Sequence, residues 1–257
     1  MITLLSPAKK LSPDCFARSH AQTQCMFLEK SQELVNILKK FDLADLQKLM
    51  GISDNLSSLT SKRFKNWRLP FTIDSARQAI FSFEGETYVG LGAGTLTTRD
   101  LEFAQNNIRI LSGLYGLLRP MDIIMPYRLE MSTKLKTNKG TSLYDFWGDL
   151  ISKLLIDELA NHEKKIIINC SSVEYFKAVN MKIVKAEVVT PVFKELRNGK
   201  PKIISFFAKK ARGAMARYII TNSISDIDGI MSFNLDNYLY DESLSSRYKP
   251  VFIRHSA

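Results

Sequence analysis

Several cationic side chains stand where predicted strands stop or loops begin. Lys9 and Lys10 follow the apolar strand predicted at residues 2–5, just after the Ser6-Pro7 break. Loops at strand ends line the ligand crevice of many α/β proteins, and cations placed there can bind phosphate groups. The candidates of this kind are Lys9, Lys10, Arg119, Arg128, Lys209, Lys210 and Arg212. Solvated loop charges, and an ion pair between Arg128 and nearby Glu130, are the structural alternatives.

The group Lys209, Lys210 and Arg212 is the most informative of these candidates. It follows a strand predicted at residues 202–207 and opens a helix predicted to end near Asn222. Cations at the start of a helix oppose the positive end of the helix dipole. A bound anion removes that conflict, so the group predicts an anion site at the start of this helix.

A second candidate is the turn Met50-Gly51-Ile52-Ser53 between helices predicted at residues 43–50 and 56–64. The pair resembles a helix-hairpin-helix, in which free N–H groups at the start of the second helix bind a DNA phosphate. Ser53 stands where that motif prefers glycine, and it can instead cap the second helix. An ordinary helical hairpin packed on the core is an equal alternative. The DNA-binding candidates here are Lys48, Gly51, Ser53, Lys62 and Arg63.

The charge balance favours an anionic partner. The chain of 257 residues has 36 Lys and Arg against 26 Asp and Glu, which gives a net charge of +10. Such an excess attracts polyanions and releases their counterions on binding. Because we find no element that reads bases, we expect duplex or structured DNA as the partner, bound without sequence preference.

The cysteines and the hydropathy exclude other classes of protein. Cys15, Cys25 and Cys170 form an odd set without CxxC spacing, which argues against a disulfide framework and fits a reducing cytoplasm. No segment has the length of a signal peptide or a membrane span. His20 lies between two of the cysteines but lacks paired ligand spacing, so we expect no metal and no cofactor. Sequence alone does not decide against a carboxylate iron site or fix the oligomeric state.

The remaining elements alternate between strands and helices. Strands are predicted at residues 2–5, 108–111, 166–169 and 251–254, and a hairpin turn at Asn198-Gly199. Helices are predicted at residues 27–41, 72–83 and 142–155, the last capped by Ser142, with another after Ser171. Glycines 90, 92 and 94 predict a flexible loop. This order predicts one mixed α/β domain over residues 1–257, its sheet flanked by helices, with a helix-hairpin-helix near residues 43–66.

Several stretches together resemble the YaaA family of bacterial peroxide-stress proteins. They run in order along nearly the whole chain and lie at residues 5–9, 63–64, 111–122, 126–131, 143–149, 174–177, 191–193 and 204–213. The resemblance implies a cytosolic protein of the peroxide response that limits DNA damage and keeps free iron low. It also implies an unusual α/β fold with a basic, DNA-binding cleft and a helix-hairpin-helix.

Two functions follow as hypotheses. The first is a DNA-binding stress protein without nameable catalysis. The alternative is an enzyme acting on a nucleotide or nucleic acid, with Lys9, Arg119, Arg128 and Lys209 holding phosphate. Its acid or base would be Glu130 or Glu174.

Overall fold

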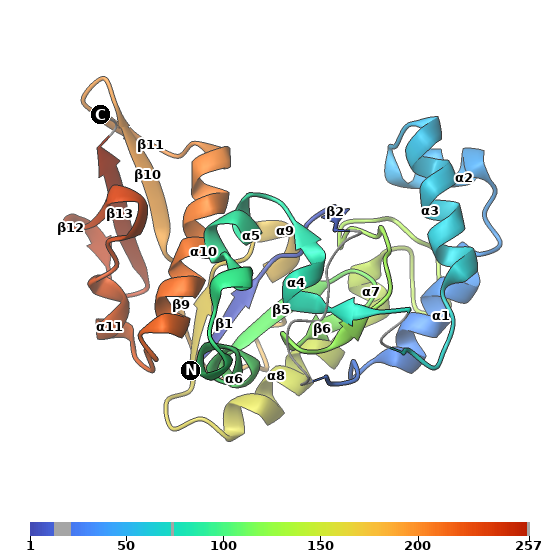
Figure 1. The fold of residues 1–257 in the computed structure, drawn as a ribbon, viewed down its shortest axis with the longest axis horizontal. Coiled ribbons are helices and arrows are strands. Elements are labelled where there is room, and N and C mark those ends of the chain that lie inside the picture. The colour runs from blue at the N-terminus through green and yellow to red at the C-terminus, as the bar shows by residue number, and fades with distance from the viewer. Residues whose placement is uncertain (13–21, 73–74, 256–257) are drawn as a thin grey trace.

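A five-stranded sheet of buried, apolar strands forms the centre of the fold (Figure 1). The computed structural model describes residues 1–12, 22–72 and 75–255. The strand order is β6 (Gly116–Leu118), β5 (Ile108–Ser112), β1 (Ile2–Leu5), β8 (Ile166–Asn169) and β9 (Glu187–Val189). β1 pairs in parallel with β5 and β8, so the carboxyl ends of these strands meet at one edge. The residues that follow β1 and β8 therefore lie close together, at the edge of the sheet where α/β proteins bind ligands.

A second sheet closes the C-terminal end of the molecule. Its order is β11 (Lys200–Lys202), β10 (Val192–Arg197), β13 (Lys249–His255) and β12 (Tyr238–Ser246). The predicted turn at Asn198-Gly199 is confirmed: both residues have positive φ, and β10 and β11 pair antiparallel around them. Short strand pairs β2 (Lys10–Leu11) with β4 (Phe83–Glu84) and β3 (Arg77–Gln78) with β7 (Ile123–Ile124) complete the strands.

α-Helices alternate with the strands along the chain, which bears out the mixed α/β class. At one end of the molecule are α1 (Leu28–Leu38), α2 (Leu43–Met50) and α3 (Asp54–Asn66), as Figure 1 shows. The others are α4 (Ala79–Ser82), α5 (Glu86–Leu91), α6 (Thr98–Asn107), α7 (Leu143–Trp147), α8 (Leu150–Ala160), α9 (Val173–Phe176), α10 (Ser205–Thr221) and α11 (Ile227–Met231). Two 3₁₀ turns lie at Ala93–Thr95 and Leu235–Asn237.

Glycines bring α5 and α10 into backbone contact. A Cβ built on Gly90 would lie 2.0 Å from the Lys210 carbonyl oxygen, and one on Gly213 would lie 1.7 Å from the Thr87 carbonyl oxygen. No larger side chain fits either position without moving a helix. The expectation of a flexible loop at residues 90–94 was therefore wrong: Gly90 is part of a helix packed tightly against α10.

Three other predicted elements differ from the structure. Residues 72–83 do not form one helix, because Arg77 and Gln78 pair with β7 as a strand. The helix predicted over 142–155 begins at its Ser142 cap but breaks at Gly148, whose φ is 47°. Residues 205–207 belong to α10 rather than to a strand, since Ala208 and Ala211 bury at helical spacing. Packing overrides the strand preference of Phe206 and Phe207 there.

Candidate nucleic-acid interface

Most of the predicted strand-end cations line one cavity. This strand-end cavity, of about 670 Å³, lies where β1 and β8 end and is bounded by residues at the starts of α5 and α9 and on the side of α10. Five cationic side chains and four carboxylates line it: Lys9, Lys10, Arg128, Lys209 and Arg212, with Glu84, Glu86, Glu130 and Glu174. The parallel pairing of β1 with β8 is what brings residues so distant in sequence together.

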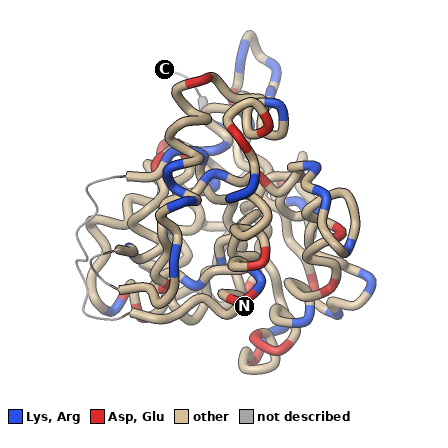
Figure 2. The backbone as a smooth tube through the Cα atoms, turned by 90° about the vertical axis from the view of Figure 1, so that its right-hand side faces the viewer, with Lys and Arg blue, Asp and Glu red and all other residues tan. Residues whose placement is uncertain are grey.

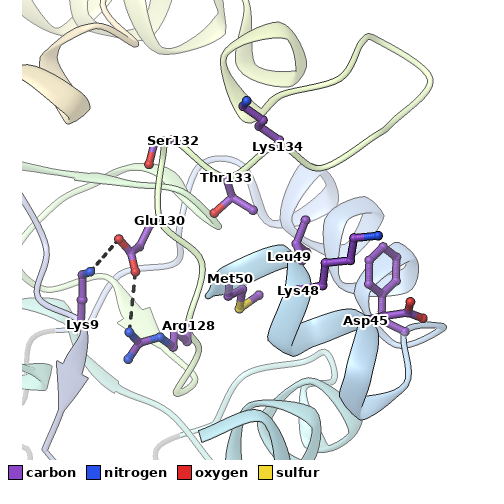
Figure 3. Close-up of a pocket in the computed structure, with 11 residues that line it drawn as sticks. Lys9, Asp45, Lys48, Leu49, Met50, Arg128, Glu130, Ser132, Thr133 and Lys134 are labelled. Carbon is purple, nitrogen blue, oxygen red and sulfur yellow. Dashed lines mark ion pairs between the residues drawn. The ribbon is translucent and has the colours of Figure 1, made fainter. Parts of the chain in front are cut away.

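A second cavity lies next to the first, toward α2. This hairpin cavity, of about 490 Å³, is lined by Asp45, Lys48, Leu49 and Met50 of α2 and by the segment 128–134 (Figure 3). Lys9, Arg128 and Glu130 line both cavities. We call the two adjacent cavities, together with the three residues that line both, the groove. It leads from the end of α2 to the side of α10.

An ion-pair trio separates the two halves of the groove. The Glu130 carboxylate lies 2.9 Å from the Lys9 ammonium and 3.6 Å from the Arg128 guanidinium, as drawn in Figure 3. The pairing of Arg128 with Glu130 predicted from their spacing is therefore present. The buried Nε of Arg128 has no hydrogen-bond partner among the described residues. Burial and the nearby Arg128 both lower the pKa of Arg63. One carboxylate thus faces several cations, which leaves the partition positively charged.

The cations of α10 divide into two kinds. Lys210 pairs with Asp236 at 3.1 Å, whereas neither Lys209 nor Arg212 forms an ion pair with any described residue. α10 begins at Ser205. Lys209, Lys210 and Arg212 therefore lie about one turn or more inside the helix and not at its start, where we expected them. The helix dipole falls off within the first turn, and our dipole argument for this anion site was therefore wrong. Lys209 and Arg212 remain candidates because they line the strand-end cavity without partners.

Cys170 forms part of the same cavity, directly after β8. Burial raises the pKa of the Cys170 thiol to about 12, and the charge of Arg212 opposes this only in part. The thiolate is the reactive form of cysteine, so this thiol is a poor nucleophile at neutral pH.

The Gly51 turn lies beside the hairpin cavity. Gly51 ends α2 in the left-handed conformation, with φ 61°, and is exposed. The Ser53 side chain makes no capping hydrogen bond, so the cap considered for it does not form. The first N–H groups of α3 consequently lack a side-chain acceptor from Ser53. Asp54 in this first turn adds a negative charge, although Gln47 donates a hydrogen bond to it at 2.9 Å.

Lys62 and Arg63 do not lie at this turn. Arg63 lies ten positions after Ser53, which corresponds to about 15 Å along α3. Lys62 instead lines a third cavity of about 550 Å³ with Phe41 and residues of α3. Arg63 is half-buried near Arg128. Of the cations near the turn in sequence, Lys48 is the one that lines the groove.

Arg119 is bound on its own loop. Its guanidinium pairs at 3.0 Å with Asp122, which is fully buried, and it also donates to the Gln24 carbonyl oxygen at 3.0 Å. Arg119 lines none of the three cavities. Arg119 therefore does not belong to the groove.

Sequence reasoning missed several residues of the groove. Tyr127 and Tyr175 form part of the strand-end cavity and are buried, and Lys134 lies in the hairpin cavity. Tyr127 stands between Pro126 and Arg128 and Tyr175 between Glu174 and Phe176, and no local pattern marks either tyrosine as part of a cavity. A helix was predicted after Ser171. Ser172 provides its cap, and Glu174 accepts a hydrogen bond from the Ser132 N–H at 3.0 Å.

Other features bear on binding more generally. Lys and Arg are spread over the whole chain in Figure 2, with Asp and Glu among them, so the +10 charge does not belong to one element.

Within the described ranges, no three His, Cys, Asp or Glu side chains group as metal ligands do. No helix in the part of the chain that the structure describes is both long and apolar enough to cross a bilayer. Cys15 and His20 lie outside the described residues.

Comparison with known proteins identifies the family. Residues 1–244 match the family described as peroxide stress protein YaaA. A UPF0246 protein of Shewanella oneidensis is 46% identical over 256 residues, covering 100% of both chains. A UPF0246 protein of Aliivibrio fischeri is 46% identical over 254 residues, covering 99% of this chain and 98% of the relative. The chain therefore belongs to the YaaA family of peroxide stress proteins, as the sequence resemblance predicted.

Proposed function

We propose that this protein binds duplex DNA along the groove and in this way limits oxidative damage to DNA in the cell. The observation that carries the proposal is that the two cavities lie side by side and share three lining residues. Their shared wall of Lys9, Glu130 and Arg128 makes one surface from the Gly51 turn to α10. The cations along it are Lys9, Lys10, Lys48, Arg128, Lys134, Lys209 and Arg212.

The expected contacts are with phosphates rather than bases. Lys48 and Lys134 lie at the outer, hairpin end of the groove. We further propose that α2 and α3 act as a helix-hairpin-helix, because the exposed Gly51 allows close approach of a strand and the first N–H groups of α3 lack a cap from Ser53. Contacts of this kind position a protein on DNA without reading its sequence.

Salt titration tests the proposal directly. If about five phosphates are neutralised, affinity should fall a few hundredfold between about 50 and 200 mM salt. The measurement is fluorescence anisotropy with duplexes of two unrelated sequences, which should give the same slope. A flat salt response would contradict groove binding.

A matched pair of charge reversals locates the contact. Lys48→Glu changes an exposed lysine of α2 in the groove, and Lys153→Glu changes an exposed lysine of α8 outside the three cavities. Both variants alter the net charge equally. Lys48→Glu should weaken binding clearly more than Lys153→Glu, with melting temperatures near that of the wild type. Equal losses would mean that only global charge matters.

An enzyme acting on a nucleotide is the second candidate. The observation in its favour is the position of the strand-end cavity at the carboxyl ends of β1 and β8, where α/β proteins place their ligands. Glu130 and Glu174 provide carboxylates there. Loss of one carboxylate should lower turnover by orders of magnitude in an enzyme, whereas it should not abolish DNA binding.

A further inference from the structure

The strand-end cavity differs from the rest of the groove in the way its charges are balanced. Glu84 pairs with Lys10 at 2.6 Å, and Glu130 pairs with Lys9 and Arg128. These pairs leave Lys209 and Arg212 as the cations of the cavity that have no carboxylate partner among the described residues. A bound anion beside α10 would provide the negative charge that Lys209 and Arg212 lack.

Hydroxyl groups accompany these two cations. Ser6 and Ser172 come directly after β1 and near the end of β8, and both line the cavity with Arg212. The Ser6 Oγ accepts a hydrogen bond from the Ser172 N–H at 2.8 Å, which fixes the two loops against each other. Cations with fixed hydroxyl groups are the set of donors that binds a phosphate monoester.

Aromatic side chains form another part of the wall. Tyr127 and Tyr175 are 4% and 8% exposed and both line the cavity. The Tyr127 hydroxyl is hydrogen-bonded to Ser112 at 2.7 Å, so its ring is held in place. Burial is the main cause that raises the pKa of Tyr127 and of Tyr175, and both phenols are neutral at physiological pH. The exposed parts of the two side chains give the cavity a small neutral aromatic surface that a planar base can contact.

Carboxylates lie beside this aromatic wall. Glu130 and Glu174 line the cavity, and their charges reinforce the effect of burial on the pKa of Tyr175. The Glu174 carboxylate is held by the Ser132 N–H. Carboxylates accept hydrogen bonds from amino groups, such as the exocyclic amine of adenine or cytosine.

We propose that the strand-end cavity binds one nucleoside monophosphate unit, with its phosphate at Lys209 and Arg212 and its base against Tyr127 and Tyr175. The volume of about 670 Å³ suits one nucleotide and is too small to enclose a duplex, which in the proposed complex lies across the mouth of the cavity. The unit is either a free nucleotide or the terminal nucleotide of a broken DNA strand, which carries the same phosphate monoester. The second source rests on the proposed DNA binding, and the first does not.

The first experiment uses free nucleotides and the full chain. Titration calorimetry with dAMP should detect binding that Arg212→Gln weakens about tenfold or more, because the variant loses a charged phosphate contact. Lys210→Gln is the matched control: it removes one cation from α10, but its ammonium pairs with Asp236 and it does not line the cavity. dAMP should also bind more tightly than dTMP, which lacks an exocyclic amine.

The second experiment uses DNA with a nick. Duplexes that differ only in a 5′-phosphate or a 5′-hydroxyl at the nick are compared by anisotropy. A strand-end site predicts about tenfold tighter binding of the phosphorylated nick, and Arg212→Gln should bring this ratio close to one while Lys210→Gln keeps it.

The outcomes separate the two proposals. If Arg212→Gln weakens dAMP binding and the protein shows no preference for a phosphorylated nick, the site binds free nucleotides. If the protein prefers the phosphorylated nick and its dAMP binding does not depend on Arg212, the site binds strand ends. If dAMP does not bind and the nick ratio is one, the nucleotide site is overturned even when intact duplex still binds. If no duplex binds at all, groove binding fails, and the dAMP result alone decides the cavity.

Discussion

The Lys9 ammonium lies 2.9 Å from the Glu130 carboxylate, and this ion pair forms part of the partition between the two halves of the groove. Lys9 is 64% exposed in its side chain, so the pair contributes little to stability. In the proposed DNA complex its effect is larger, because Glu130 neutralises cations that would otherwise interact with a phosphate.

Glu130→Gln should therefore strengthen DNA binding. The substitution removes the negative charge between Lys9 and Arg128 and leaves a side chain of similar size. We expect a several-fold gain in affinity at about 100 mM salt, with an unfolding midpoint close to the wild type. Anisotropy and thermal denaturation measure the two quantities. Glu163→Gln, at an exposed position outside the cavities, is the charge-matched control. A gain no larger than that of the control would mean that Glu130 does not face the DNA.

Lys62→Glu should affect DNA binding less than Lys48→Glu. Lys62 is exposed on α3 and lines the third cavity, whereas Lys48 lines the groove. Both substitutions reverse one charge of the same helical hairpin. Comparison of the two dissociation constants at one salt concentration distinguishes them. A larger loss for Lys62→Glu would place the DNA on the other side of α3 and displace the groove proposal.

Gly90→Ala should destabilise the fold and displace α10. The added Cβ would lie 2.0 Å from the Lys210 carbonyl oxygen, so the helices must separate. We expect a loss of about 1–3 kcal/mol or more in the free energy of unfolding, together with weaker DNA binding. Gly51→Ala is the comparison: its Cβ meets nothing within 4 Å, and only the positive φ of 61° opposes it. Urea denaturation should rank Gly90→Ala as the more damaging change, and the opposite order would rule out the close helix crossing.

Cys170 should react slowly with hydrogen peroxide at neutral pH. With its pKa raised to about 12 by burial, less than about one thiol in ten thousand is ionised at pH 7. Because the folded-state pKa is above the unfolded one, the protonated thiol favours folding at neutral pH, and this contribution declines above about pH 9. Mass spectrometry of the peroxide-treated protein should find Cys170 oxidised no faster than a buried reference thiol such as Cys25. Rapid formation of a sulfenic acid at Cys170 would contradict this and indicate a peroxide sensor.

Local signals determined much of the secondary structure. The apolar runs at residues 2–5 and 166–169, the bounds of α2 and the turn at Asn198-Gly199 follow from periodicity and turn chemistry that operate over a few residues. The Ser142 cap and the pairing of Arg128 with Glu130 are also short-range. The family could also be recognised from the sequence alone, because its motifs are short and occur in order along nearly the whole chain.

Tertiary structure decided which of the predicted cations share a surface. Lys9 and Arg212 are far apart in sequence and line one cavity because β1 and β8 pair in parallel and α10 packs on α5. Arg119 is bound instead to a buried carboxylate, and the length of α3 carries Lys62 away from the Gly51 turn. Such outcomes depend on packing between distant segments, which spacing along the chain does not encode.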